Sequence, residues 1–228
     1  MTLGPMLYRY SKKRSRRNLY AWMREAIVTF HLDKQSDILN IGAGGEVSTV
    51  LAQAGVKATS VDVDPARQPD IVAGLEDMRR FSDATAGAIF CIEVLEHVPR
   101  PHVAVSEIYR VLRPGGLLVG STPFLLGIHD GPNDYFRFTR HGLAYLFGAF
   151  EPVLMRERNG YFSSVAVLVH RWFVIGGSGR RAVSVLLSPI LLICAAMFEA
   201  VDRLLPSTAA TTGYFFIFRK PLSSSVAR

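Results

Sequence analysis

Short apolar runs alternate with segments of helical periodicity along much of the chain. The runs with the length and composition of strands cover residues 38–41, 56–61, 86–92, 117–122, 150–155 and 213–220, and a shorter one begins the stretch 70–77. The segments with apolar residues at helical spacing cover 18–30, 47–54 and 102–112. The run 86–92 is continuously apolar, which is typical of a strand buried on both faces. Strands that alternate with helices in this way favour a parallel α/β sheet.

The first apolar run ends in a glycine-rich turn. Gly42, Gly44 and Gly45 separate the run 38–41 from the helical segment 47–54. Glycine lets the backbone turn tightly and approach a ligand without an intervening Cβ, and the N-terminus of a helix offers free N–H groups to anything negative. This order indicates a nucleotide-type site, although an ordinary tight connection between a strand and a helix gives the same pattern.

An acidic residue follows the second apolar run. Asp62 lies about 20 residues after the glycine turn, where a carboxylate can accept hydrogen bonds from the two hydroxyls of a ribose. Asp64 directly precedes Pro65, a pairing that is more typical of a residue that shapes a turn. We therefore take Asp62 as the candidate ribose ligand.

The composition raises the question of a membrane or polyanion partner. Of the 228 residues 49% are hydrophobic, and the mean hydropathy is +0.21. The net charge is +7, and much of the excess lies between Arg9 and Arg17. Such a cluster can bind anionic lipid headgroups or nucleic acid phosphates, or it can be a solvated arm. Between the two ligands we favour lipid.

The two cysteines give no sign of a disulfide framework or of a metal site. Cys91 and Cys194 are far apart in the sequence, and Cys91 lies in the buried run 86–92. A reducing cytosol is therefore the expected compartment. The basic N-terminal segment is not followed by the apolar core and cleavage site of a secretory signal.

A long apolar segment separates the last two predicted strands. Residues 182–198 carry no charge and include Pro189, and Arg180 and Arg181 precede them. The segment is marginally short for a bilayer span of about 20 residues. Because His170 and Arg171 interrupt the preceding apolar run, a second crossing is disfavoured as well. We expect a pair of helices that lies in the membrane interface. A lid over the acceptor site, a homodimer contact and, least favoured, a spanning helix are the alternatives.

Four motifs in register resemble one family. They are Leu39-Asn40-Ile41-Gly42-Ala43-Gly44, Val61-Asp62-Val63-Asp64-Pro65, Glu93-Val94-Leu95-Glu96-His97-Val98 and Arg110-Val111-Leu112-Arg113-Pro114-Gly115-Gly116. Their order and spacing resemble the class I S-adenosylmethionine-dependent methyltransferases of type 11. The resemblance implies a Rossmann-like α/β fold, with a seven-stranded, mostly parallel sheet and helices on both faces. The hydrophobic helical insertion then lies between strands six and seven.

This fold divides the chain into four expected regions. Residues 1–35 form a basic arm and a covering helix, and residues 36–160 with 211–220 form the methyltransferase core. Residues 161–210 form the insertion, and residues 221–228 form a flexible tail.

The resemblance also implies S-adenosylmethionine as the cofactor. The positions that it assigns to cofactor binding are Asn40, Gly42, Ala43, Gly44, Asp62, Val63, Leu75, Glu76, Cys91 and Ile92. Three residues depart from the family pattern. Asn40 stands where Asp is usual, Glu46 replaces a further glycine of the turn, and Gly74 stands where an Asp often meets the adenine.

The acceptor side is expected in the loops that follow the fourth and fifth strands. His97, His129 and Asp134 are the candidate catalytic residues, and Tyr135 and Arg137 are the candidates for orienting the acceptor. For each of them a structural hydrogen bond within the loop is an equal alternative. We expect no metal in the site. Glu93, Glu96 and His97 nevertheless resemble the Mg²⁺ site of some methyltransferases, and this alternative stays open.

The function expected from these observations is methyl transfer to a small-molecule, lipid-linked or glycan-pathway acceptor, at a hydroxyl. The enzyme would be cytoplasmic and peripheral to the inner face of the membrane, with an anionic lipid surface as a partner. One alternative is a catalytically degenerate module of the same fold, tethered to membrane, which Asn40, Glu46 and Gly74 favour. An RNA methyltransferase, suggested by the basic arm, is the less favoured third possibility.

Overall fold

The computed structural model describes residues 3–129, 131–174 and 178–222. These residues form two compact units, which are described separately below. The sheet unit comprises residues 19–122, 131–156 and 215–222. The helical unit comprises residues 3–18, 123–129, 157–174 and 178–214. The part of the expected tail at 223–228 lies outside the described residues.

A seven-stranded sheet organises the sheet unit, in the order β3-β2-β1-β4-β5-β7-β6. The strands are β1 (Ile38–Ile41), β2 (Ala58–Asp62), β3 (Ile71–Val72), β4 (Ala86–Ile92), β5 (Leu112–Pro123), β6 (Glu151–Glu157) and β7 (Gly213–Arg219). Strands β1 to β5 pair in parallel. The chain reverses at β7, because the Gly115 N–H near the start of β5 donates to the carbonyl of Lys220, beyond the end of β7. The predicted, mostly parallel sheet is confirmed.

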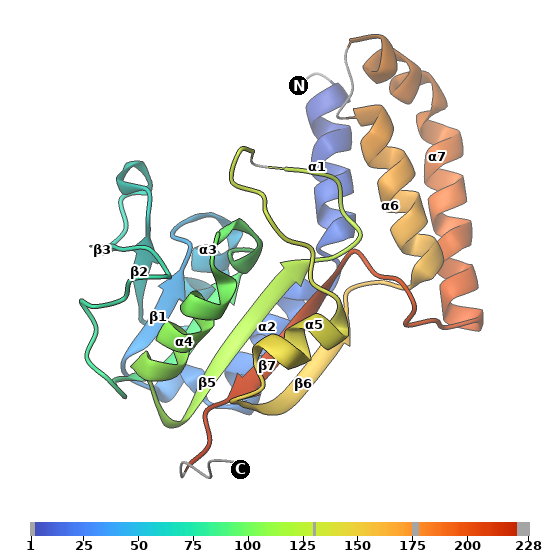
Figure 1. Cartoon of the computed structure of the whole chain (residues 1–228). Coiled ribbons are helices and arrows are strands. Elements are labelled where there is room, and N and C mark those ends of the chain that lie inside the picture. Colours follow the sequence, from blue (N-terminus) through green and yellow to red (C-terminus); the bar gives the residue numbers. More distant parts are fainter. Residues whose placement is uncertain (1–2, 130, 175–177, 223–228) are drawn as a thin grey trace. The chain divides into compact units, whose positions relative to one another are not determined.

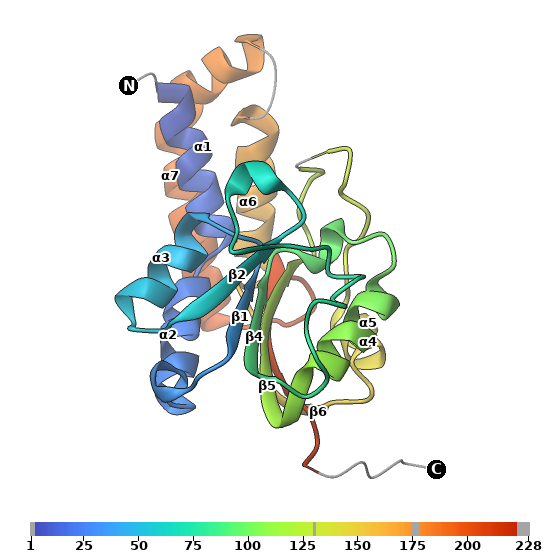
Figure 2. The same ribbon diagram turned by 90° about the vertical axis from the view of Figure 1, so that its left-hand side faces the viewer.

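Helices cover both faces of this sheet, and its strands are correspondingly apolar. Figure 2 shows α2 (Leu19–Thr29) and α3 (Gly45–Gln53) on one face, and α4 (Pro101–Val111) and α5 (Arg140–Leu146) on the other. All seven residues of β4 are buried. Leu19, Met23 and Ile27 of α2 join the core cluster that contains Phe90 of this strand. Burial on both faces explains why the run 86–92 is continuously apolar.

Strand β5 begins five residues earlier than the sequence predicts. The motif Arg113-Pro114-Gly115-Gly116 ends helix α4 at Val111, as a stop signal should, but it then forms the first part of the strand. The pairing of β4 with β5 shifts register between Ala86 and Ala88, and Gly115 has φ +77°. A bulge of this kind accommodates an extra residue at the start of a strand.

The helical unit contains three long helices that run side by side (Figure 1). They are α1 (Leu3–Ser15), α6 (Tyr161–Val174) and α7 (Ser178–Leu204), and α7 includes Pro189 in its interior. Residues 3–15, expected as an arm, therefore form a helix that packs against α6 and α7. Among the described residues, no helix combines the length and the apolar character that a bilayer crossing requires.

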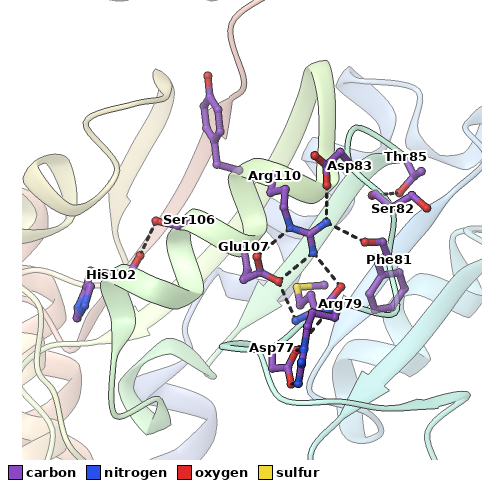
Figure 3. A network of polar contacts seen from close by, with 12 residues as sticks. Asp77, Arg79, Phe81, Ser82, Asp83, Thr85, His102, Ser106, Glu107 and Arg110 are labelled. Carbon is purple, nitrogen blue, oxygen red and sulfur yellow. Dashed lines mark hydrogen bonds and ion pairs between the residues drawn. The ribbon is translucent and has the colours of Figure 1, made fainter.

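Arg110 on α4 holds the loop of residues 77–83 in the sheet unit (Figure 3). Its guanidinium donates to the carbonyl oxygens of Met78 and Phe81 and to the carboxylates of Glu107 and Asp83. Glu107 also accepts the N–H of Met78 at 2.9 Å. The hydrogen bonds from Arg110 lower the pKa of Glu107 below its ordinary value. One cation thus satisfies several backbone and carboxylate acceptors that would otherwise lose their partners.

We expect Arg110→Met to lower the free energy of unfolding at pH 7 by about 2 kcal/mol, because hydrogen bonds to a charged group are lost. Since the pKa of Glu107 is lowered in the folded state, its contribution is fully present above the unfolded value of about 4.5 and is lost as the pH falls through the folded value. Urea unfolding of both proteins should therefore show a difference that shrinks below about pH 4.5.

Arg79→Met is the matched control for this experiment. Arg79 pairs with Asp77 in the same loop, but its side chain is 86% exposed. An exposed pair of this kind contributes little to stability, so Arg79→Met should leave the free energy of unfolding nearly unchanged. Equal losses in the two variants would contradict the role assigned to Arg110.

Candidate functional site

The glycine turn between β1 and α3 leaves space at the end of the sheet. Gly42, Gly44 and Gly45 have φ of +87°, +92° and +67°, values that L side chains rarely adopt. A Cβ added at Gly44 or Gly45 would meet no atom within 4 Å. Gly44 caps α3, and no side chain occupies the cap. The turn therefore offers space beside the first turn of helix α3, the end of a helix that favours an anionic or polar ligand.

Asp62 ties this turn to the neighbouring strand. One of its carboxylate oxygens accepts the N–H of Ala43 at 2.8 Å, and the other accepts the N–H of Asp64 at 2.9 Å. The residue is buried, with 8% of its surface exposed. Each carboxylate oxygen has two lone pairs, so both retain the capacity to accept a further hydrogen bond. Asp64 caps the turn 65–67 by accepting the N–H of Ala66, which is the turn-shaping role predicted for it.

Asn40 presents a buried acceptor beside the same turn. The residue is 2% exposed, and its Nδ2 donates to the Ser48 hydroxyl at 3.2 Å. Ser48 in turn accepts the N–H of Gly44 at 3.1 Å. The Oδ1 atom of Asn40 has no hydrogen-bond partner within the described part of the chain. A buried acceptor of this kind calls for a ligand or another partner.

The segment after β3 borders a hollow of about 400 Å³, lined by Val72, Ala73, Gly74, Asp77, Arg79 and Arg80. Leu75 is buried, whereas the side chain of Glu76 accepts a hydrogen bond from Arg100 at 2.8 Å. Val63, after β2, is 72% exposed. The hollow lies beside β3, at the edge of the sheet, and its volume leaves room for a flat ring.

The end of β4 contributes an uncharged, apolar surface. Cys91 and Ile92 are buried at the end of this strand. Burial raises the pKa of the Cys91 thiol far above its ordinary value, and the negative charge of Glu96 raises it further. The thiol is therefore neutral and unreactive at physiological pH.

The turn after β4 places His97 next to a buried carboxylate. Glu93 has φ +57°, an unusual value for a residue with a side chain, and the short helix η3 (Leu95–His97) follows it. Glu96 is fully buried, and one of its oxygens lies 3.7 Å from Nε2 of His97. The Nδ1 atom of His97 contacts the carbonyl oxygen of Asn133. Because a carbonyl only accepts, the proton of the neutral imidazole lies on Nδ1, and Nε2 is the basic nitrogen.

The loop of residues 131–139 packs on this turn, as expected for the two predicted acceptor segments. The N–H groups of Tyr135 and Phe136 donate to the carbonyl oxygen of Glu96 at 2.9 and 3.2 Å. The Tyr135 hydroxyl donates to the side chain of Asn133 at 3.0 Å. Thr139 caps helix α5 through the N–H of Gly142. Backbone hydrogen bonds thus fix the loop against η3.

Asp134 and Arg137 form a clamp inside this loop. The two terminal nitrogens of Arg137 each donate a hydrogen bond of 2.6 Å to one carboxylate oxygen of Asp134. The Asp134 side chain is 2% exposed. These hydrogen bonds raise the pKa of Arg137, and the charges of Glu96 and Glu93 raise it further. Asp134 therefore orients Arg137 in this structure.

The two histidines predicted as catalytic candidates lie in different units. His129 belongs to the helical unit, whereas His97 belongs to the sheet unit.

Two contributors to this site were not predicted from the sequence. Arg100 pairs with Glu76, and the backbone carbonyl of Asn133 fixes the tautomer of His97. A backbone carbonyl carries no residue signature, so no pattern could have identified it. Arg100 precedes the Pro101 that begins α4, and its side chain gave no separate signal.

The sequence of the chain is similar to those of known methyltransferases. Residues 39–120 match the family model described as a methyltransferase domain. A ubiquinone biosynthesis O-methyltransferase of Xylella fastidiosa is 35% identical over 100 residues, which are 37% of this chain and 41% of the relative. One from Pseudomonas entomophila is 32% identical over 115 residues, which are 43% and 47% of the two chains. The chain thus spans less than half the length of these relatives.

Solved structures of low sequence identity share the fold. A SAM dependent methyltransferase from Archaeoglobus fulgidus has a TM-score of 0.56 at 13% identity, and the match covers 93% of this chain and 99% of that one. The 1,6-didemethyltoxoflavin-N1-methyltransferase of Burkholderia thailandensis, solved with S-adenosylhomocysteine, has a TM-score of 0.51 at 19% identity, with coverages of 87% and 76%.

Proposed function

We propose that the chain is a class I methyltransferase of type 11, the family whose model matches residues 39–120, and that it transfers a methyl group from S-adenosylmethionine to a small-molecule or lipid-linked acceptor. The observation that carries the proposal is the glycine turn. It is open to a ligand, it is held by Asp62, and it lies beside the buried acceptor atom of Asn40.

The residues around the turn suit the parts of this cofactor. The backbone of Gly42, Ala43 and Gly44 would lie against its methionine moiety, and the Oδ1 atom of Asn40 would accept from the ammonium group. The carboxylate of Asp62 keeps acceptor capacity for the ribose hydroxyls. The residues that would border the adenine and floor the pocket are Val63, Leu75, Glu76, Cys91 and Ile92. The neutral Cys91 thiol avoids both nucleophilic attack on the cofactor and an extra charge below it.

The cofactor supplies a methyl group on a positively charged sulfur, and the protein holds the acceptor in line with it. Positioning of this kind can contribute about 7 to 11 kcal/mol. Nε2 of His97 would take the proton from an acceptor hydroxyl, while Nδ1 stays bound to the Asn133 carbonyl. The nearby carboxylate of Glu96 would stabilise the resulting imidazolium. Tyr135 and Arg137, with Asp134 behind them, would orient the acceptor.

The acceptor proposed here is a hydroxyl compound of a lipid-linked or glycan pathway. The apolar helices α6 and α7 and the basic α1 support an acceptor at a membrane surface, and the relatives named above act, by their names, as O-methyltransferases. His129 is kept as a second candidate base.

A catalytically degenerate binding module is the second candidate function. Asn40 brings no negative charge to the ammonium site, and Gly74 brings no side chain to the hollow after β3. Cofactor binding without methyl transfer to any extracted acceptor would favour it. RNA binding that weakens steeply with salt would instead favour an RNA methyltransferase.

Titration calorimetry with S-adenosylhomocysteine tests the cofactor site. We expect Asn40→Ala to weaken binding about tenfold or more, because one hydrogen bond to a charged ammonium is lost. Asn40→Asp should tighten binding, because it places a carboxylate beside the same group. Gln53→Ala, an exposed amide at the end of α3, is the control and should leave the affinity unchanged. The cofactor assignment fails if the wild-type protein does not bind the compound at millimolar concentration.

Transfer of labelled methyl groups into lipid and polar cell extracts tests the base. Loss of a general base costs typically about 10²- to 10⁴-fold in rate, so His97→Ala should lose most of the incorporation while its affinity for S-adenosylhomocysteine stays the same. His102→Ala removes an exposed imidazole from α4 of the same unit and should retain full activity. Undiminished incorporation by His97→Ala would remove His97 from the mechanism.

A further inference from the structure

The interior of the helical unit is unusually polar. Arg171 on α6 is buried and donates to the hydroxyls of Ser11 and Ser15 on α1, at 3.2 and 3.1 Å. His170 is buried as well, and its ring packs edge-on against Tyr10 at 5.6 Å. Hydrogen bonds and a ring contact therefore join α1 to α6, where a bundle in water would normally place apolar side chains.

The acidic residues of α7 are also used inside the unit. Glu199 pairs with Arg14 and Arg17 from the α1 segment. Asp202 accepts the N–H groups of Phe162 and Ser163 at 3.0 and 2.7 Å, and so caps the start of α6. These contacts fix α1, α6 and α7 to one another through their polar faces.

The outer face of α7 is apolar and exposed. Leu186, Ile190, Ile193 and Met197 are separated by four, three and four residues, a spacing that puts them on one side of a helix. Their exposed fractions are 78%, 57%, 61% and 60%. On α6, the exposed residues Leu168, Val169 and Trp172 line an apolar hollow of about 300 Å³. Large apolar side chains that gather exposed on one side of a helix are typical of a contact site.

The charge of the unit indicates what covers this surface. The helical unit contains 11 Lys and Arg residues and 3 Asp and Glu residues, so its net charge is +8, against +7 for the whole chain. Arg14, Arg17 and Arg171 are used inside the unit, and the other basic residues include exposed ones that can meet a partner. Lys12 and Lys13 on α1 are exposed. The exposed Arg180 lies over the ring of Trp172 at 5.1 Å, and both side chains combine an apolar body with a polar end. Such residues are typical of the zone between lipid chains and headgroups.

We propose that the exposed apolar face of α6 and α7 binds the surface of an anionic lipid bilayer. The helices lie in the interfacial zone, with the apolar side chains among the upper acyl chains and the basic residues toward the headgroups. The face does not span the bilayer, because no described helix has the required length and apolar character. A second copy of the chain is a poorer occupant, because two surfaces of the same high positive charge repel each other. The inference is independent of the proposed methyl transfer.

Cys194 provides a probe within this face. It is exposed and lies next to Ile193, whereas Cys91 is buried and its thiol is kept neutral by a raised pKa. An environment-sensitive fluorophore will therefore label Cys194 selectively in the folded protein. We expect its emission to shift to the blue with phosphatidylserine vesicles and not with phosphatidylcholine vesicles, and the shift to diminish as salt is added. No shift with phosphatidylserine would overturn the proposal.

Paired substitutions identify the surface that binds. Ile190→Glu and Ile193→Glu each remove a large apolar side chain from the lipid contact, and each should weaken vesicle partitioning about tenfold or more. Lys12→Glu combined with Lys13→Glu should weaken it with a reduced salt dependence. Val28→Glu, a matched substitution of an exposed aliphatic residue on α2, should change nothing. A blue shift without lipid that grows with protein concentration would overturn the proposal in favour of a second copy.

Discussion

The hydrogen bond from the Ala43 N–H to Asp62 fixes the end of the sheet on which the site is built. Strands β1 and β2 are parallel neighbours, so their carboxyl ends lie at the same edge. The Gly42 N–H donates a hydrogen bond to the carbonyl of Val61, and the Ala43 N–H donates one to the carboxylate of Asp62. Two successive donors of the turn therefore hold the same end of β2. The turn therefore needs no side chain of its own to keep its shape, and Gly44 and Gly45 leave space for a ligand. Every assignment made for the cofactor depends on this geometry.

The sheet, the glycine turn and the acidic end of the second strand could be predicted from the sequence because their signals are local. An apolar run, a glycine turn and an acidic strand end occur within 25 residues, and each is dictated by backbone conformation or burial. The second half of the site depends on contacts that have no local signal. Backbone groups of Glu96, Tyr135, Phe136 and Asn133 join η3 to the loop 131–139. Any residue type could supply them, so the sequence predicted two acceptor segments without the hydrogen bonds that hold them together.

In the helical unit, too, long-range contacts decide a feature that the sequence pattern could not predict. The apolar composition of the segment after β6 predicted a pair of helices, but it could not tell whether their apolar faces point inward or outward. That choice is made by Arg171, which donates hydrogen bonds to Ser11 and Ser15 on α1. These serines are 160 and 156 positions away from it in the sequence. Once a buried guanidinium is committed to α1, the polar faces must point inward, because an unpaired buried charge would cost several kcal/mol. The residues expected as a solvated arm are thus the polar partner that turns the apolar face of α6 and α7 outward.

The two units place different demands on the chain. A cofactor site needs fixed donors and acceptors, and the sheet unit supplies them from strand ends whose positions are set by a buried core. A lipid surface needs only apolar area and positive charge in rough register, because it has no fixed partner atoms. The helical unit has these properties, and its hydrogen bonds and ion pairs hold its three helices together. A hydroxyl compound with a lipid tail would be concentrated where such a surface docks, so membrane contact would raise the occupancy of the acceptor site without any added contact in the site itself.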